Sequence, residues 1–155
     1  MFKVICIYVL IFSFPSELFA KLFRNNEIKF HCVGRKYENV SMAAYYPKYN
    51  YEIDNEEDIK DDNGQTLQTL QDYLDDRADF VTLAMDKKLK LPYGTPVCIP
   101  ELNEHFGHKI RFEIRDSGSD LDNMGFHRVD VCVRSEIDSY DKYVNRKVTL
   151  IIEEY

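Results

Sequence analysis

Short runs of β-branched and aromatic residues, separated by polar and turn-forming residues, occupy most of the second half of the chain. Runs of this kind are typical of strands that turn one face toward a core. An earlier stretch, residues 28–46, has the same character around Gly34 and predicts a hairpin. The later runs predict five strands, at residues 80–85, 95–100, 109–115, 128–133 and 147–152.

Two segments have the pattern of helices. In residues 66–78, Leu67, Leu70 and Leu74 fall on one stripe at helical spacing, with polar residues opposite. Residues 135–144 begin with Ser-Glu-Ile-Asp, which resembles a capping box and predicts a short second helix. Many short strands with two small helices favour a mainly β fold, a closed β-barrel, over a parallel α/β sheet.

The first twenty residues differ from the rest and predict a secretory signal peptide. Lys3 gives a positive start, residues 4–12 are an unbroken apolar run, and Ala20 ends an imperfect cleavage motif. The run is too short to cross a bilayer of roughly 30 Å as a helix. We therefore expect one domain, residues 21–155, secreted or periplasmic, with no membrane contact in the mature form. A buried N-terminal strand is the alternative.

Charge and cysteine content narrow the classes of partner. The net charge is −7, and it is unchanged without residues 1–20, because they carry one Lys and one Glu. An acidic protein does not attract phosphate backbones by charge, so we expect no nucleic acid partner. We also expect a monomer. Three cysteines remain after residue 20, namely Cys32, Cys98 and Cys132, which allows at most one disulfide and a free thiol.

Several common site chemistries are missing from the sequence. No histidine has a Ser-His-Asp or zinc-like spacing, and there is no nucleotide-binding glycine pattern. His105 and His108 flank a Phe-Gly pair that predicts a hairpin tip. The acid-rich segment 49–64 lacks EF-hand spacing and predicts a solvated loop. We expect neither a metal nor a cofactor.

Aspartates at or near predicted strand ends are the remaining candidates. Asp86 follows one apolar run, and Asp116 ends another before a glycine-containing turn. Asp130 lies inside an alternating strand, where Asp is disfavoured. If Val129 and Val131 face the core, Asp130 lies on the opposite face. Residues that break local rules are often functional, although an exposed surface Asp is the alternative.

Three stretches together resemble a known family. They are AMDKKLKLPYGTPVCIP from Ala84, RDSG from Arg115 and RVDV from Arg128. In this order they look like the three-aspartate ("3D") domain, which is similar to the catalytic barrel of the MltA-type lytic transglycosylases and of small secreted relatives in spore-forming bacteria. The resemblance covers about residues 40–152.

The resemblance implies a six-stranded double-psi β-barrel with an open groove that binds peptidoglycan or a related polysaccharide. It implies that Asp130 is the catalytic acid/base and that Asp116 and Asp86 lie beside it. In this interpretation, Asp130 cleaves the bond after N-acetylmuramic acid and closes a 1,6-anhydro ring, while Asp116 keeps it oriented and protonated. Expected substrate-binding residues are Thr95, as a hydrogen-bond donor, and Tyr45 or Tyr46, as a sugar platform unless they serve in packing.

One loop departs from the family pattern and leaves alternatives open. SDLDNMGF from Ser119 replaces the family's Gly-Gly and Lys-Gly, and the segment between Asp116 and Asp130 is longer. Asp120 and Asp122 in this loop are expected to be solvated, with a cation site as the alternative. One alternative hypothesis is that the protein is a hydrolase with two carboxylates roughly 6.5–9.5 Å apart. A non-catalytic glycan-binding barrel of the expansin or barwin kind is another.

Overall fold

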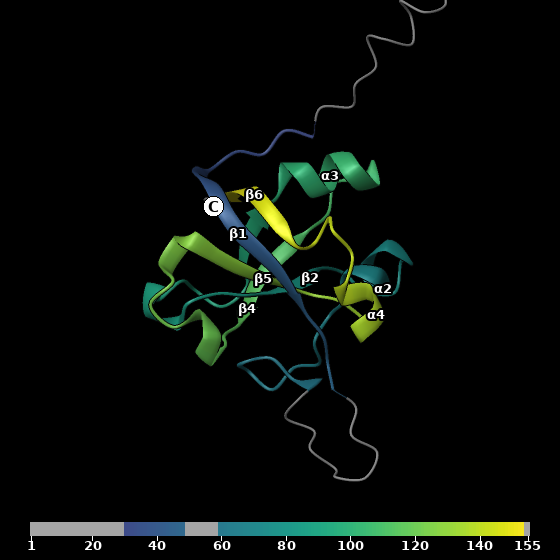
Figure 1. Ribbon diagram of the computed structural model, residues 1–155, viewed down its shortest axis with the longest axis horizontal. Coiled ribbons are helices and arrows are strands. Elements are labelled where there is room, and N and C mark those ends of the chain that lie inside the picture. Colours follow the sequence, from purple (N-terminus) through teal and green to yellow (C-terminus); the bar gives the residue numbers. More distant parts are fainter. Residues whose placement is uncertain (1–29, 49–58, 154–155) are drawn as a thin grey trace, which may run out of the picture.

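The computed structural model describes residues 30–48 and 59–153. The predicted signal peptide, residues 1–20, lies outside these ranges. The fold is mainly β, with six strands closed into a barrel in the order β1-β5-β2-β4-β3-β6 (Figure 1). The strands are β1 (Arg35–Tyr45), β2 (Val81–Ala84), β3 (Thr95–Cys98), β4 (Phe112–Asp116), β5 (Arg128–Cys132) and β6 (Arg146–Ile152).

The barrel is mixed rather than purely antiparallel. Strand β1 runs parallel to β5, β2 runs parallel to β4, and the other four pairs are antiparallel. Alternation in the last four strands follows the predicted pattern. Val129, Val131 and Val133 are fully buried in the core, so Asp130 lies on the opposite face of β5, as predicted.

The predicted hairpin at residues 28–46 is wrong for its described part. Residues 35–45 form one long strand that pairs with β5 on one side and β6 on the other. Gly34 precedes this strand and does not turn it back. A Cβ at Gly34 would lie 2.0 Å from the carbonyl oxygen of Ile152, so this glycine permits a close backbone approach.

The described residues contain three short α-helices, where two were predicted. They are α2 (Leu70–Leu74), α3 (Pro100–Phe106) and α4 (Glu136–Ser139). Helix α2 starts later than predicted because Thr69 caps it, and it ends at Leu74. Helix α4 starts at the predicted Ser135 cap but ends at Ser139, before the predicted end near residue 144. The predicted hairpin tip around His105 is wrong, since this region is helix α3. Its signals are Pro100 at the first turn and Gly107, with φ of 62°, at the end.

The three cysteines among the described residues form one disulfide and leave one free thiol. Cys32 forms a disulfide with Cys98, which ties the segment before β1 to β3, and Cys132 is a free buried thiol. Within residues 30–48 and 59–153, no helix is long and apolar enough to cross a membrane.

Candidate active site

The strand register brings the three predicted aspartates to one end of three neighbouring strands. Ala84, at the end of β2, pairs with Asp116 of β4 on one side and Asp130 of β5 on the other. Asp86 follows Ala84 by two residues. At a strand spacing of about 4.8 Å, the Cα atoms of Asp116 and Asp130 are about 10 Å apart.

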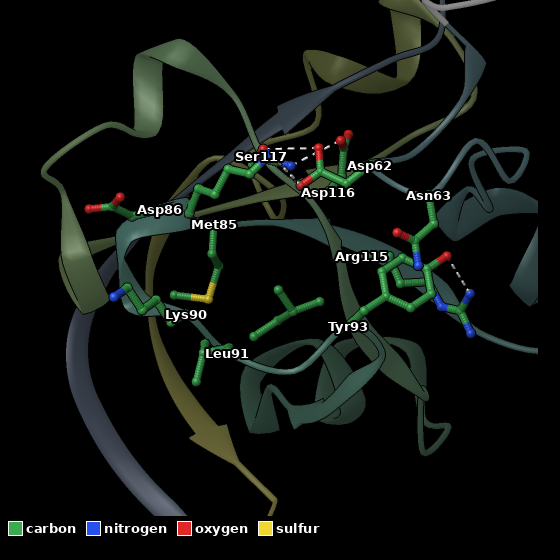
Figure 2. Close-up of a pocket in the computed structure, with 12 residues that line it drawn as sticks. Asp62, Asn63, Met85, Asp86, Lys90, Leu91, Tyr93, Arg115, Asp116 and Ser117 are labelled. Atoms are coloured by element: carbon green, nitrogen blue, oxygen red, sulfur yellow. Dashed lines mark hydrogen bonds and ion pairs between the residues drawn. The ribbon is translucent and has the colours of Figure 1, made fainter.

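A pocket of about 320 Å³ opens at this end of the barrel. Figure 2 shows Asp86 at one end of the pocket, Tyr93 at the other and Asp116 on the wall between them. Asp130, Thr95, Tyr45 and Tyr46 do not line this pocket. Apolar side chains also line it, namely Met85, Leu91 and Ile114.

Asp86 is a structural anchor in this arrangement. Asp86 is 5% exposed, and its carboxylate accepts hydrogen bonds from the backbone N–H groups of Lys88 and Gly125, each at 2.9 Å. The hydrogen bond from Gly125 lowers the pKa of Asp86 most, and the one from Lys88 lowers it further. The side chain thereby caps the 3₁₀ helix η2 (Lys87–Leu89) and ties the loop before β5 to the end of β2.

Asp116 has the opposite electrostatic environment. It is half-buried, and its carboxylate accepts hydrogen bonds from the Tyr45 hydroxyl and the Ser117 backbone N–H, each at 2.9 Å. Burial raises the pKa of Asp116 despite these two donors, and the nearby charges of Asp62 and Asp61 raise it further. The site therefore favours the neutral acid here more than an exposed position would.

Tyr45 serves Asp116 and does not face the pocket. The side chain is half-buried, and burial, followed by the proximity of Cys132 and Asp116, raises the pKa of Tyr45 well above its ordinary value. Burial likewise raises the pKa of the Cys132 thiol. Tyr45 is thus a hydrogen-bond donor at neutral pH, and Cys132 stays a thiol. Tyr46 packs against the core.

Asp130 is engaged by an arginine of its own strand. Arg128 donates to it through Nε at 2.9 Å and through Nη2 at 3.2 Å, and the Asp130 side chain is 13% exposed. The hydrogen bond to Asp130 raises the pKa of Arg128. Both carboxylate oxygens of Asp130 therefore accept from one guanidinium, which fixes the orientation of the side chain.

Thr95 lies in a turn that presents the preceding tyrosine to the pocket. Its hydroxyl donates to the Pro92 carbonyl oxygen at 2.6 Å, and its backbone N–H donates to the same oxygen at 3.0 Å. Gly94 has a φ of 78°, as the third residue of a type II turn requires. The LPYGT motif thus builds the turn that carries Tyr93.

Tyr93 and Arg115 were not predicted from the sequence as site residues. Arg115 donates through Nε to Glu113 at 2.7 Å and through Nη1 to the Tyr93 hydroxyl at 2.8 Å. Its guanidinium carbon lies 3.9 Å from the ring centroid of Phe80 and 4.7 Å from that of Tyr93. Their position in the motifs LPYGT and RDSG, beside the predicted site residues Thr95 and Asp116, could have indicated them.

The turn at residues 59–66 lines the pocket through Asp62 and Asn63, and residues 62–64 are exposed, as predicted for the solvated loop at 49–64. Residues 49–58 lie outside the described ranges, but Asp61 is 7% exposed. Its carboxylate accepts from the backbone N–H groups of Asn63 and Gln65 and from the Tyr93 hydroxyl. Asp62 accepts from the Ser117 hydroxyl at 3.0 Å. The acids here are held by hydrogen bonds to the barrel.

Comparisons with known proteins do not identify a family for the chain. No protein-family model matches the chain, and no curated protein matches it. Among the described residues there is also no group of three or more His, Cys, Asp or Glu side chains placed to hold a metal ion. The site is therefore interpreted from its own geometry.

Proposed function

We propose that the protein is a secreted lytic transglycosylase that cleaves peptidoglycan or a related polysaccharide at this pocket. One observation carries the proposal. Asp116, whose surroundings favour the neutral acid, lines the pocket, and Asp130, whose carboxylate is held by Arg128, lies on the far side of β2 from it. Carboxyl groups with environments that separate their roles are the recurring arrangement of glycosidic cleavage. The barrel order and the resemblance to the three-aspartate family support a double-psi topology.

The geometry favours Asp116 rather than Asp130 as the acid/base. A general acid has to carry a proton when the substrate arrives, and burial favours the proton at Asp116. Asp116 would donate this proton to the glycosidic oxygen as the C1–O bond breaks. As a carboxylate it would then accept the proton of the muramoyl C6 hydroxyl while that oxygen bonds to C1, which closes the 1,6-anhydro ring and restores the acid.

Asp130 does not line the pocket, so it would act on the reaction from a distance, through its charge. An oxocarbenium-like transition state is positive at the sugar ring, and a nearby carboxylate stabilises it. Arg128 holds the Asp130 side chain by two hydrogen bonds, so little reorganisation would accompany the reaction. In this assignment, Asp86 has no chemical role and keeps the loop before β5 in place.

The disulfide supports the extracellular part of the proposal. Disulfides persist in secreted and periplasmic proteins and are rare where the cytosol keeps thiols reduced. The bond between Cys32 and Cys98 is therefore in keeping with a cleaved signal peptide at residues 1–20.

Digestion of purified peptidoglycan tests the proposal. The protein is incubated with sacculi and the soluble products are identified by mass spectrometry. We expect muropeptides that end in 1,6-anhydro-N-acetylmuramic acid, and a fall in their release of about 100-fold or more with Asp116→Asn. Asp79→Asn is the matched control, since Asp79 is exposed just before β2, at the opposite end of that strand. Its rate should equal that of the wild type.

Other products would contradict parts of the proposal. New reducing ends in place of anhydro ends would identify a hydrolase. Unchanged release with Asp116→Asn, together with loss in Asp130→Asn, would return the acid/base role to Asp130.

The Arg128–Asp130 ion pair also favours a second candidate, a non-catalytic glycan-binding barrel. If both carboxylate oxygens of Asp130 serve only to fix Arg128, the site lacks the second carboxylate that cleavage uses. Protein that pellets with intact sacculi and releases no fragments would establish this second function.

A further inference from the structure

Tyr93 is a large side chain left exposed where a ligand would lie. It is 40% exposed and lines the pocket at the end opposite Asp86 (Figure 2). An exposed tyrosine on its own is ordinary surface. This one differs because both its ring and its hydroxyl are held in place.

The hydroxyl of Tyr93 is fixed from two sides. It donates to the Asp61 carboxylate and accepts from Arg115 Nη1 at 2.8 Å. Its backbone is fixed as well, because the Gly94 N–H donates to the Ile114 carbonyl at 2.8 Å and thereby joins the turn to β4. The ring therefore keeps one orientation before any ligand arrives, which reduces the entropy lost on binding.

The ring is also backed on one side. The Arg115 guanidinium lies over it, and Phe80 in turn lies over that guanidinium. Tyr93 is nevertheless 40% exposed and lines the pocket, so part of its ring is available to a ligand there. Two acids and a cation on the lining supply hydrogen-bonding partners for hydroxyl groups, namely Asp62, Asp116 and Lys90.

A flat apolar face surrounded by hydrogen-bonding groups matches the chemistry of a pyranose ring. Such a ring has C–H groups on its faces and hydroxyl groups around its edge, so its face packs on an aromatic ring while its edge bonds to polar side chains. We propose that Tyr93 is the platform on which a pyranose ring of the glycan stacks, which places the adjoining glycosidic bond toward Asp116. This inference rests on the proposed function and names the subsite that positions its substrate.

The chain contains no tryptophan, which gives a direct test. Tyr93→Trp places a single fluorescent indole at the platform, and Asp116→Asn in the same chain prevents turnover. The probe is a hexasaccharide of β-1,4-linked N-acetylglucosamine, titrated while Trp emission is recorded. We expect a saturable shift of the emission to shorter wavelength as the sugar covers the ring. No change in emission up to the solubility limit of the hexasaccharide would overturn the inference.

Affinity measurements on the native ring complete the test. By calorimetry in the Asp116→Asn background, Tyr93→Ala should weaken hexasaccharide binding by about tenfold, and Tyr93→Phe should weaken it less. Tyr140→Ala is the control, since Tyr140 is 74% exposed beyond helix α4 and does not line the pocket. Equal affinity in Tyr93→Ala and Tyr140→Ala would overturn the platform.

Binding and cleavage can fail separately. Sugar stacking without any anhydro product would refute the transglycosylase and leave the subsite in place. Anhydro products together with unchanged affinity in Tyr93→Ala would refute the subsite and leave the enzyme in place.

Discussion

Asp86 and Asp116 lie at equivalent ends of two parallel neighbouring strands, yet their pKa values shift in opposite directions. Hydrogen bonds from Gly125 and Lys88 lower the pKa of Asp86, while burial raises that of Asp116. Asp116 ends β4 and Asp86 follows the end of β2 by two residues, so a place at this end of the barrel does not by itself decide the chemistry of either residue. At Asp86 the backbone donors outweigh burial, whereas at Asp116 burial outweighs the two donors.

The difference separates two kinds of carboxylate environment. Asp86 accepts from two backbone N–H groups that belong to different segments, so its charge joins those segments. Asp116 accepts from one backbone N–H and one tyrosine hydroxyl, and two further acids lie near it. Burial and these two acids favour its proton, and groups with shifted pKa values often cluster at functional sites.

The largest expected effect comes from removing Asp61, which holds the turn at residues 59–66 against the pocket. Asp61→Ala deletes the acceptor of three hydrogen bonds, so the free energy of unfolding should fall by about 3 kcal/mol, roughly 1 kcal/mol per bond. The pKa of Asp116 should also fall, because Asp61 is one of the charges that raise it. Urea denaturation measures the first effect, and NMR titration of the Asp116 carboxyl carbon measures the second.

Asp62→Ala, in the same turn, is the matched control for Asp61→Ala. The Asp62 side chain is 34% exposed, accepts one hydrogen bond, from the Ser117 hydroxyl, and forms an ion pair with Lys87 that spans 3.8 Å, so its removal should cost only about 1 kcal/mol. A loss in Asp61→Ala no greater than that in Asp62→Ala would contradict the anchoring role of Asp61.

The sequence predicted the strands better than the connections. Alternation in 128–133 and 147–152 fixed which side chains enter the core, because burial on one face imposes a period of two. Helix α3 was missed because Pro100 and Gly107 are also turn residues. The hairpin at 28–46 was wrong because a glycine required for close approach has the same sequence signature as one required for a turn.

The candidate site shows the same division between local and tertiary information. Asp86, Asp116 and Asp130 could be chosen from local patterns, and the register brings them to one end of the barrel. The roles of Tyr93 and Asp61 depend on a contact across 32 residues of chain, which no local pattern contains.

A smaller effect should follow removal of the hydroxyl that bonds to Asp116. Tyr45→Phe deletes the donor to its carboxylate, and since that bond favours the charged form, the pKa of Asp116 should rise further. The fold should lose about 1 kcal/mol for the missing hydrogen bond. NMR titration of Asp116 in both proteins checks the direction, and a lower pKa in Tyr45→Phe would refute this account of the pair.

The smallest expected effects are on the pH dependence of stability, where the two aspartates should act with opposite sign. The folded pKa of Asp86 lies below its ordinary value of 3.8, so its contribution is present above that value and is lost as pH falls through the folded pKa. The folded pKa of Asp116 lies above 3.8, so its contribution is present below that value and is lost as pH rises through the folded pKa. Asp86→Asn should therefore make stability fall less steeply toward acid, and Asp116→Asn should make it fall less steeply as pH rises toward neutral. Urea denaturation from about pH 2.5 to pH 7 measures both slopes. Changes of the same sign in the two variants would show that the aspartates have the same kind of environment, and the distinction between anchor and acid would then fail.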